Sequence, residues 1–135
     1  MSNVDIYDTT LRDGTQREGI SFSVADKLRI AEQLDALGVA FVECGWPGSN
    51  PKDAELFRRA KDMEWHRTTL AAFGATRKAG ITPDEDANLR ALLDSGAKAC
   101  TLFGKTSLVH VQQVLRTTPD ENLAMIEDSV RFLAA

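Results

Sequence analysis

The residues with the clearest chemical potential lie near the N-terminus, in the segment Asp8-Thr9-Thr10-Leu11-Arg12-Asp13-Gly14-Thr15-Gln16. The segment directly follows a short apolar run and combines carboxylates, a guanidinium, hydroxyls and an amide. A further carboxylate, Glu43, lies near the end of a second apolar run. Carboxylate oxygens suit a divalent cation such as Mg²⁺ or Mn²⁺, and an arginine beside them suits an oxygen that gains negative charge during a reaction. The pattern therefore indicates metal-assisted or anion-stabilising chemistry.

The same residues also have a purely structural interpretation. Asp-Gly is a common turn dipeptide. Arg12 could form a structural ion pair with Asp8, Asp13 or Glu43 and have no role in catalysis. Residue types and spacing give the two interpretations about equal weight, so the elements that position these residues become decisive.

Four short apolar runs alternate with longer amphipathic segments, and they cover residues 4–8, 39–44, 68–73 and 97–103. Their spacing fits a strand, a crossover helix and two short loops per repeat, and their apolar character is typical of parallel strands. Such βα units form either an open doubly wound sheet or part of a (β/α)₈ barrel. In both architectures ligands bind at the C-terminal ends of the strands, where Arg12, Asp13 and Glu43 are expected.

The amphipathic segments carry helix-start and helix-end signals. Four starts are expected at the caps Ser23, Asn50, Thr82 and Thr118, and two helix ends at Gly38 and Gly96. A further short helix is predicted over residues 107–115. The apolar spacing predicts that these side chains face inward: Leu28, Ala31, Leu34, Leu37, Ala54, Phe57, Met63, Leu89, Leu92, Leu93, Leu123, Ile126, Val130 and Leu133.

Length and composition describe one globular domain of 135 residues, 43% of them hydrophobic, with a formal net charge of -4. The acidic balance without basic clusters argues against a nucleic-acid partner. No apolar stretch approaches the ~20 residues that span a bilayer, so no membrane partner is expected. Residues 1–5 lack signal-peptide features. Cys44 and Cys100 form no CxxC pair and are expected to be reduced, buried thiols, which favours a cytoplasmic location.

The segments DTTLRDGTQ and VECGWPG together resemble the DRE-TIM metallolyase superfamily, the metal-dependent acyl-CoA synthases and lyases with a DxxxRDG signature. Its members include citramalate, 2-isopropylmalate and homocitrate synthases and hydroxymethylglutaryl-CoA lyase. The segments GWPGSNPKD, AAFGATRKAG and FGKTSLVHV are most similar to the citramalate synthase branch. The resemblance implies an α/β fold of parallel (βα)₄ units, the N-terminal half of a (β/α)₈ TIM barrel. Residues 1–135 would then be one partial domain, with the C-terminal half of the barrel absent.

The resemblance also implies roles for individual residues. Asp13 matches the family's ligand to a divalent metal, which would be Mg²⁺, Mn²⁺ or Zn²⁺. Arg12 matches the arginine that stabilises an enolate or alkoxide oxygen and orients a 2-keto acid. Glu43 matches a glutamate that handles substrate, and Gln16 matches a substrate-binding position near the active site. In such enzymes the metal chelates the keto acid, a base deprotonates the methyl group of the co-substrate acetyl-CoA, and the carbanion adds to the ketone before the thioester is hydrolysed.

Three residues after the fourth apolar run are expected on the same side as the site. Lys105 and Thr106 could contact a phosphate or CoA, with solvent exposure as the alternative. His110 could contact substrate, with a position on a helix surface as the alternative. His66 precedes the third run, lies on the opposite side and is expected to be structural.

The histidines depart from the family pattern. The other metal ligands of the family form a His-x-His pair, whereas this sequence contains only His66 and His110. The resemblance therefore implies an incompletely ligated metal and a chain that is inactive or nearly so by itself. The parent enzyme would condense acetyl-CoA with a 2-keto acid, with pyruvate favoured and citramalate the product, in branched-chain amino-acid (isoleucine or leucine) biosynthesis.

Two other hypotheses remain open. Four strands of a barrel leave two open edges and an uncovered inner face, which favours a homodimer or a larger homo-oligomer and is compatible with a non-catalytic, self-associating module. Alternatively, the chain belongs to the lyase branch, which cleaves a hydroxyacyl-CoA. The segments GWPGSNPKD and FGKTSLVHV argue against the lyase branch.

Overall fold

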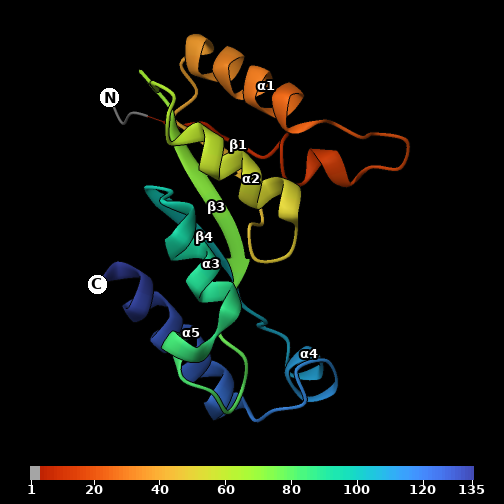
Figure 1. Cartoon of the computed structure of the whole chain (residues 1–135). Coiled ribbons are helices and arrows are strands. Elements are labelled where there is room, and N and C mark those ends of the chain that lie inside the picture. The colour runs from red at the N-terminus through yellow and green to blue at the C-terminus, as the bar shows by residue number, and fades with distance from the viewer. Residues whose placement is uncertain (1–3) are drawn as a thin grey trace.

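Four parallel strands form one sheet in the order β1-β2-β3-β4 (Figure 1). In this computed structural model, which describes residues 4–135, the strands are β1 (Tyr7–Asp8), β2 (Phe41–Gly45), β3 (Thr69–Ala75) and β4 (Ala99–Phe103). All four predicted strands are confirmed, although each begins one to three residues after the start of its apolar run. Residues 1–3, part of the segment that lacks signal-peptide features, lie outside the described residues.

The strand order and one contact distinguish the two architectures that fit the sequence. A doubly wound sheet reverses its order at a switch point, which places its first strand inside the sheet. In this chain the order is sequential, with β1 at one edge. The hydroxyl of Tyr7 on β1 also contacts the hydroxyl of Thr101 on β4. In a flat sheet these two strands would be three spacings apart, about 14 Å, so the sheet is strongly curved, as an arc of a barrel is.

Helices α1, α2 and α3 follow one another on one face of this sheet (Figure 1). The helices are α1 (Val24–Leu37), α2 (Pro51–Ala60), α3 (Ala87–Ser95), α4 (Leu108–Gln113) and α5 (Pro119–Ala134), with 3₁₀ turns at Gly14–Gln16 and Pro83–Glu85. Their apolar side chains form one core with one face of the strands, which includes Leu28, Leu56, Leu89, Val42 and Cys44. The opposite face of the sheet carries the polar side chains described below. No helix among residues 4–135 is long and apolar enough to cross a bilayer.

The predicted helix starts and ends are confirmed with one change. As predicted, Ser23, Asn50 and Thr118 cap the starts of α1, α2 and α5 with their side chains. Gly38 and Gly96, both in the left-handed conformation, follow the ends of α1 and α3. Thr82 caps only the short 3₁₀ turn. Helix α3 begins after it, because the carboxylate of Asp86 accepts the first backbone N–H groups of that helix.

Some side chains predicted to be buried are exposed. They are Leu37, Ala54, Leu93 and Cys100, together with Leu123 and Val130 on α5. Leu37 ends α1, where the chain turns away from the core, and α2 buries Leu56 and Phe57 instead of Ala54. Cys100 lies on β4, and no described strand pairs with the outer edge of β4.

Helix α5 differs most from its prediction because its buried face is partly polar. It buries Asn122, Met125 and Ser129, whereas Leu123 is 64% exposed. Ser129 Oγ accepts the backbone N–H of Arg77 at 2.8 Å, and the Asn122 amide donates to the carbonyl of Lys105 at 2.9 Å. These bonds fix the helix to two loops at the C-terminal ends of β3 and β4, which apolar spacing alone does not reveal.

A buried carboxylate, Asp35 of α1, fixes the entry to β3. Its two oxygens accept the backbone N–H groups of His66, Arg67 and Thr68 at 2.8–3.1 Å. Burial raises the pKa of the Asp35 carboxyl, but the bonds from Arg67, Thr68 and His66 lower it by more, so the pKa lies below its ordinary value. Asp35 therefore stabilises the fold as an anion.

Replacing Asp35 with asparagine is expected to lower the free energy of unfolding by about 1–3 kcal/mol, because the amide offers only one acceptor oxygen to these donors. Since the folded pKa is lowered, the carboxylate contributes fully above pH 3.8, and its contribution is lost as the pH falls through the folded value. Urea unfolding at neutral pH and below pH 3.8 measures both effects. If Asp35→Asn lowered the free energy of unfolding by the same amount at both pH values, Asp35 would not stabilise the fold as an anion.

Candidate functional site

A compact turn after β1 places Arg12 at the C-terminal end of the sheet. The carbonyl of Thr9 accepts the N–H groups of Arg12, Asp13 and Gly14 at 2.9–3.2 Å. Leu11, which is fully buried, anchors the turn in the core. The motif read from the sequence thus forms a rigid loop, with Leu11 directed into the core and the two charged residues after it directed away.

Arg12 and Glu43 form a largely buried ion pair. Arg12 Nε donates to Glu43 Oε1 at 2.5 Å, and the side chains are 20% and 2% exposed. The second carboxylate oxygen, Oε2, accepts the hydroxyl of Tyr7 at 2.7 Å. Both oxygens of Glu43 are therefore occupied, and the buried carboxylate is compensated by a cation and a hydrogen bond.

The guanidinium of Arg12 is also held by an aromatic ring and a second carboxylate. Its Cζ lies 4.0 Å from the centroid of the Phe73 ring, and Nη1 lies 3.2 Å from Asp13 Oδ1. Asp13 is 65% exposed, in contrast to Glu43. No described residue accepts a hydrogen bond from Arg12 Nη2. The arrangement leaves this part of the cation free to bind an anion.

Arg12 opens onto a cleft of about 550 Å³ at the C-terminal ends of β2, β3 and β4. Its walls include Arg12, Gln16, Trp46, Phe73, Phe103 and Lys105. The aromatic rings form a series, with the Trp46 and Phe73 centroids 5.3 Å apart and those of Phe73 and Phe103 6.4 Å apart. The cleft thus combines an apolar wall with cationic side chains, among them Arg12 and Lys105, which suits a small organic anion.

The Trp46 wall is fixed by a chain of polar contacts. Its Nε1 donates to Asn88 Oδ1 at 2.6 Å, and the Asn88 amide donates to the carbonyl of Ala75 at 2.6 Å. Its backbone N–H donates to Asp53 Oδ2 at 2.9 Å, and Asp53 Oδ1 pairs with Lys27 Nζ at 2.6 Å. The ring therefore has one defined position over the cleft.

Gly45 allows Asp53 to come this close to the strand end. Its φ is +151°, and a Cβ atom built on Gly45 would lie 2.3 Å from Asp53 Cγ. The ladder between β2 and β3 also shifts register between Glu43 and Gly45. Such irregularities redirect side chains at the ends of strands. The backbone conformation of Gly45 and this register shift direct Glu43 and Trp46 towards the cleft.

The structure brings four of the seven predicted site residues to the cleft, places Asp13 beside Arg12 but outside the lining, and separates two from it. Arg12, Gln16 and Lys105 line the cleft, and Glu43 contacts Arg12 directly beneath it. Lys105 Nζ lies 4.7 Å from the centroid of the Phe103 ring. Thr106 and His110 are exposed and do not line the cleft, and His110 lies on the surface of α4.

Four residues that shape this site are not among the residues predicted for it: Tyr7, Phe73, Asn88 and Thr101. Tyr7 pairs with Phe41, and alternation along β2 then places Tyr7 on the same face as Glu43. The sequence gives the alternation within each strand, but this register comes from the structure. Asn88 lies 42 residues from Trp46 in the chain, and no sequence signal connects them.

The fit of this site to a divalent metal depends on Asp13. Asp13 offers a mostly exposed carboxylate, while both oxygens of Glu43 already have partners. Residues 4–135 contain no group of three histidine, cysteine, aspartate or glutamate side chains that could hold a metal ion. The described residues alone therefore do not form a complete metal site.

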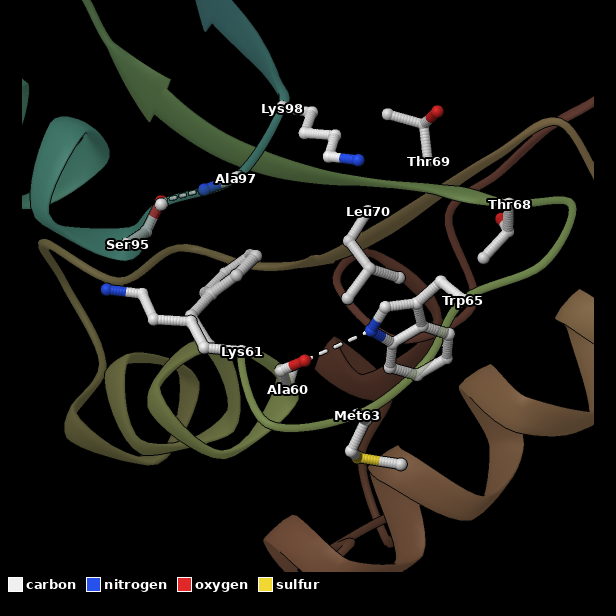
Figure 2. Close-up of a pocket in the computed structure, with 12 residues that line it drawn as sticks. Ala60, Lys61, Met63, Trp65, Thr68, Thr69, Leu70, Ser95, Ala97 and Lys98 are labelled. Atoms are coloured by element: carbon white, nitrogen blue, oxygen red, sulfur yellow. Dashed lines mark hydrogen bonds between the residues drawn. The ribbon is translucent and has the colours of Figure 1, made fainter.

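A second hollow of about 350 Å³ lies at the opposite end of the sheet, between the end of α2 and the starts of β3 and β4 (Figure 2). Trp65 closes part of it and donates from Nε1 to the carbonyl of Ala60 at 3.1 Å. His66 also lies at this end, as predicted, and its backbone N–H bonds to Asp35. The N-terminal end of a parallel sheet contributes to stability, whereas ligands bind at the other end.

Comparison with known proteins gives a consistent result along the chain. Residues 3–135 match the HMGL-like family model. The chain is 52% identical over 135 residues to the (R)-citramalate synthase of Geobacter sulfurreducens, covering 100% of this chain and 26% of that protein. It is 55% identical over 131 residues to the (R)-citramalate synthase of Streptomyces coelicolor, covering 96% and 24%.

More distant relatives also match nearly the whole of this chain and only part of their own length. The chain is 39% identical over 129 residues to the 2-isopropylmalate synthase of Pyrococcus furiosus, covering 96% of this chain and 25% of that protein. It thus spans about a quarter of the length of these curated relatives. The crystal structure of the Bacillus subtilis HMG-CoA lyase matches with a TM-score of 0.68 at 21% identity, covering 95% of this chain and 41% of that chain. This similarity shows a shared fold.

Proposed function

Because the chain belongs to the HMGL-like family, we propose that it forms the keto-acid-binding part of an acyltransferase that condenses acetyl-CoA with a 2-keto acid. Pyruvate is the favoured keto acid and citramalate the product. The observation that carries the proposal is the Arg12 guanidinium, held by Glu43 and Phe73 at the end of an apolar cleft. The 52% and 55% identities to (R)-citramalate synthases support this choice of branch.

The geometry suits the charge that develops in such a condensation. A base removes a proton from the acetyl methyl group, and the resulting carbanion forms a carbon–carbon bond to the keto carbon. The π bond of the keto group breaks at the same time, so the keto oxygen becomes an alkoxide, which then takes up a proton. Arg12 offers a positive charge to this oxygen and to the carboxylate of the keto acid. Because Glu43 already fixes Nε, the guanidinium needs little reorganisation during the reaction. Hydrolysis of the thioester by water then releases CoA.

Other residues of the cleft would bind the two substrates. We propose that Gln16 contacts the keto acid and that the Lys105 ammonium contacts a phosphate of the acyl-CoA. Trp46 and Phe73 form an apolar wall that would accept the methyl group of pyruvate and exclude water. The charged and apolar parts of the cleft thus match the two ends of a small keto acid.

We also propose Asp13 as one ligand of a divalent metal, with Mg²⁺, Mn²⁺ or Zn²⁺ as candidates. Its exposed carboxylate next to Arg12 supports this role. When bound, such a metal would polarise the carbonyl group of the keto acid. Since the described residues do not complete the site, we assign no catalytic step to the metal.

Residues 1–135 are proposed to be the first half of a TIM barrel in a cytoplasmic enzyme of branched-chain amino-acid biosynthesis. The sequential strand order and the coverage of 41% of the lyase chain support the half-barrel. The relatives are named citramalate and 2-isopropylmalate synthases, which supports a synthase as the parent enzyme. In this proposal the chain alone has little or no activity.

A chimera tests the proposed function. Residues 1–135 replace the matched segment of the Geobacter sulfurreducens (R)-citramalate synthase, and the release of free CoA thiol is measured with acetyl-CoA and a panel of 2-keto acids. We expect citramalate from pyruvate, lower rates with larger keto acids, and little thiol release by the 135-residue chain alone. A folded chimera that releases no thiol would overturn the proposal, and one that cleaves a hydroxyacyl-CoA would assign the chain to the lyase branch.

The open edge of β4 leads to a prediction about self-association. Leu93 and Val130 are 48% and 52% exposed, and both line a largely apolar hollow of about 400 Å³ beside β4. We expect the isolated chain to form a homodimer or a larger species, because unpaired strand edges and apolar surface favour association. Light scattering should give at least twice the mass of the chain, and a Val130→Lys variant should shift towards the monomer. A stable native monomer would contradict this prediction.

A further inference from the structure

Tyr7 connects the first and last strands of the sheet directly beneath the cleft. Its hydroxyl donates to Glu43 Oε2 at 2.7 Å and contacts the hydroxyl of Thr101. The ring stacks on Phe41, with centroids 5.9 Å apart. Two strands other than its own thus hold this side chain, although its ring is partly exposed on the inner face of the sheet.

Tyr7 has a geometric consequence for Arg12. The carboxylate plane of Glu43 is set by two bonds, one to the Tyr7 hydroxyl and one to Arg12 Nε. If the first bond is removed, the carboxylate can rotate about its terminal torsion, for which the energy surface is broad. The guanidinium would then lose its fixed orientation over Phe73.

We propose that Tyr7 is a positioning residue. Its hydroxyl, in contact with Thr101, fixes the Glu43 carboxylate, and the carboxylate in turn holds the Arg12 guanidinium in one orientation at the cleft. This inference rests on the proposed function, because it assigns Arg12 a substrate to stabilise. Tyr7 itself does not line the cleft, so it acts through Glu43.

The contact can be tested without any activity, because Tyr7 is the single tyrosine of the chain. Burial, followed by the hydrogen bond to Glu43, raises the pKa of Tyr7 to about 12, while the Thr101 bond lowers it. The tyrosinate absorbance of the native chain should therefore stay low between pH 10 and 11 and reach its midpoint near pH 12, whereas the urea-unfolded chain ionises with a midpoint near pH 10. Circular dichroism at each pH confirms that the native sample is folded.

Two variants of the chain should move this titration in opposite directions. Glu43→Gln removes the negative charge beside the phenolate, so the pKa of Tyr7 should fall. Thr101→Val removes the bond that favours the phenolate, so the pKa of Tyr7 should rise. A native midpoint near 10, or a Glu43→Gln variant with an unchanged midpoint, would overturn the proposed contact.

The positioning role is tested in the chimera with Tyr7→Phe, which removes only the hydroxyl. We expect kcat to fall ten- to a hundredfold with KM for pyruvate changed less than about twofold, because misalignment of a charged group affects the transition state more than binding. The control Thr69→Val also removes a hydroxyl, but at the N-terminal end of β3 and outside the lining of the cleft, so it should keep the parent kcat. A Tyr7→Phe variant with the parent kcat would overturn the positioning role and leave the proposed function intact. If the unsubstituted chimera is inactive, the proposed function fails, and the positioning role fails with it.

Discussion

Replacing Arg12 with alanine in the chimera is expected to reduce the rate of citramalate formation about a thousandfold. The structure fixes this guanidinium at one end of the cleft, with Nε on Glu43 and Cζ over the Phe73 ring. Loss of one pre-organised group that stabilises an oxyanion costs about a hundred- to a thousandfold in kcat. The measurement is the steady-state release of free CoA thiol with acetyl-CoA and pyruvate.

Two further variants separate catalysis from folding. Arg12→Lys keeps the positive charge but loses the planar fork that contacts Glu43 and Phe73, so we expect a partial loss. Arg58→Ala removes a surface arginine whose pair with Glu55 is largely exposed, and the rate should not change. A folded Arg12→Ala chimera with more than a tenth of the parent kcat would contradict the role of Arg12 in catalysis.

Replacing Asp53 with alanine is expected to lower the free energy of unfolding of the chain by about 3–5 kcal/mol. Lys27 and Asp53 are only 6% and 7% exposed, so the substitution leaves a buried ammonium without its partner. It also removes the acceptor of the Trp46 N–H. Urea unfolding followed by circular dichroism measures the loss.

The double variant Lys27→Met/Asp53→Leu is the matched control. It removes both charges and fills the space with apolar side chains, so it should lose less stability than Asp53→Ala. Glu55→Ala, which breaks an exposed pair, should change the free energy of unfolding by no more than about 1 kcal/mol. A single variant as stable as the native chain would show that the buried pair does not stabilise this loop.

The strand ends were the part of the site that could be predicted from the sequence. The apolar runs indicated parallel strands, and parallel strands place their C-terminal ends together, so Arg12 and Glu43 were expected near each other. The 2.5 Å bond between them confirms this expectation. The choice between an open sheet and a barrel needed the strand order and the contact of Tyr7 with Thr101, neither of which spacing can supply.

The parts that could not be predicted depend on polar contacts between distant segments. Asn122 and Ser129 turn α5 so that Leu123 is exposed, because their partners are loop groups outside the helix. Asn88 fixes Trp46 in the same way. Apolar periodicity describes which face can be buried in a core, but it contains no information about such hydrogen bonds. The exposed positions of Thr106 and His110 likewise follow from the course of the loop after β4.

The most direct test of the central claim is a crystal structure of the chimera with pyruvate bound. We expect pyruvate to lie in the cleft beside Trp46 and Phe73, with an oxygen within hydrogen-bond distance of the Arg12 guanidinium, while Glu43 still holds Nε. A structure in which pyruvate binds elsewhere, with Arg12 contacting only Glu43 and Asp13, would contradict that claim.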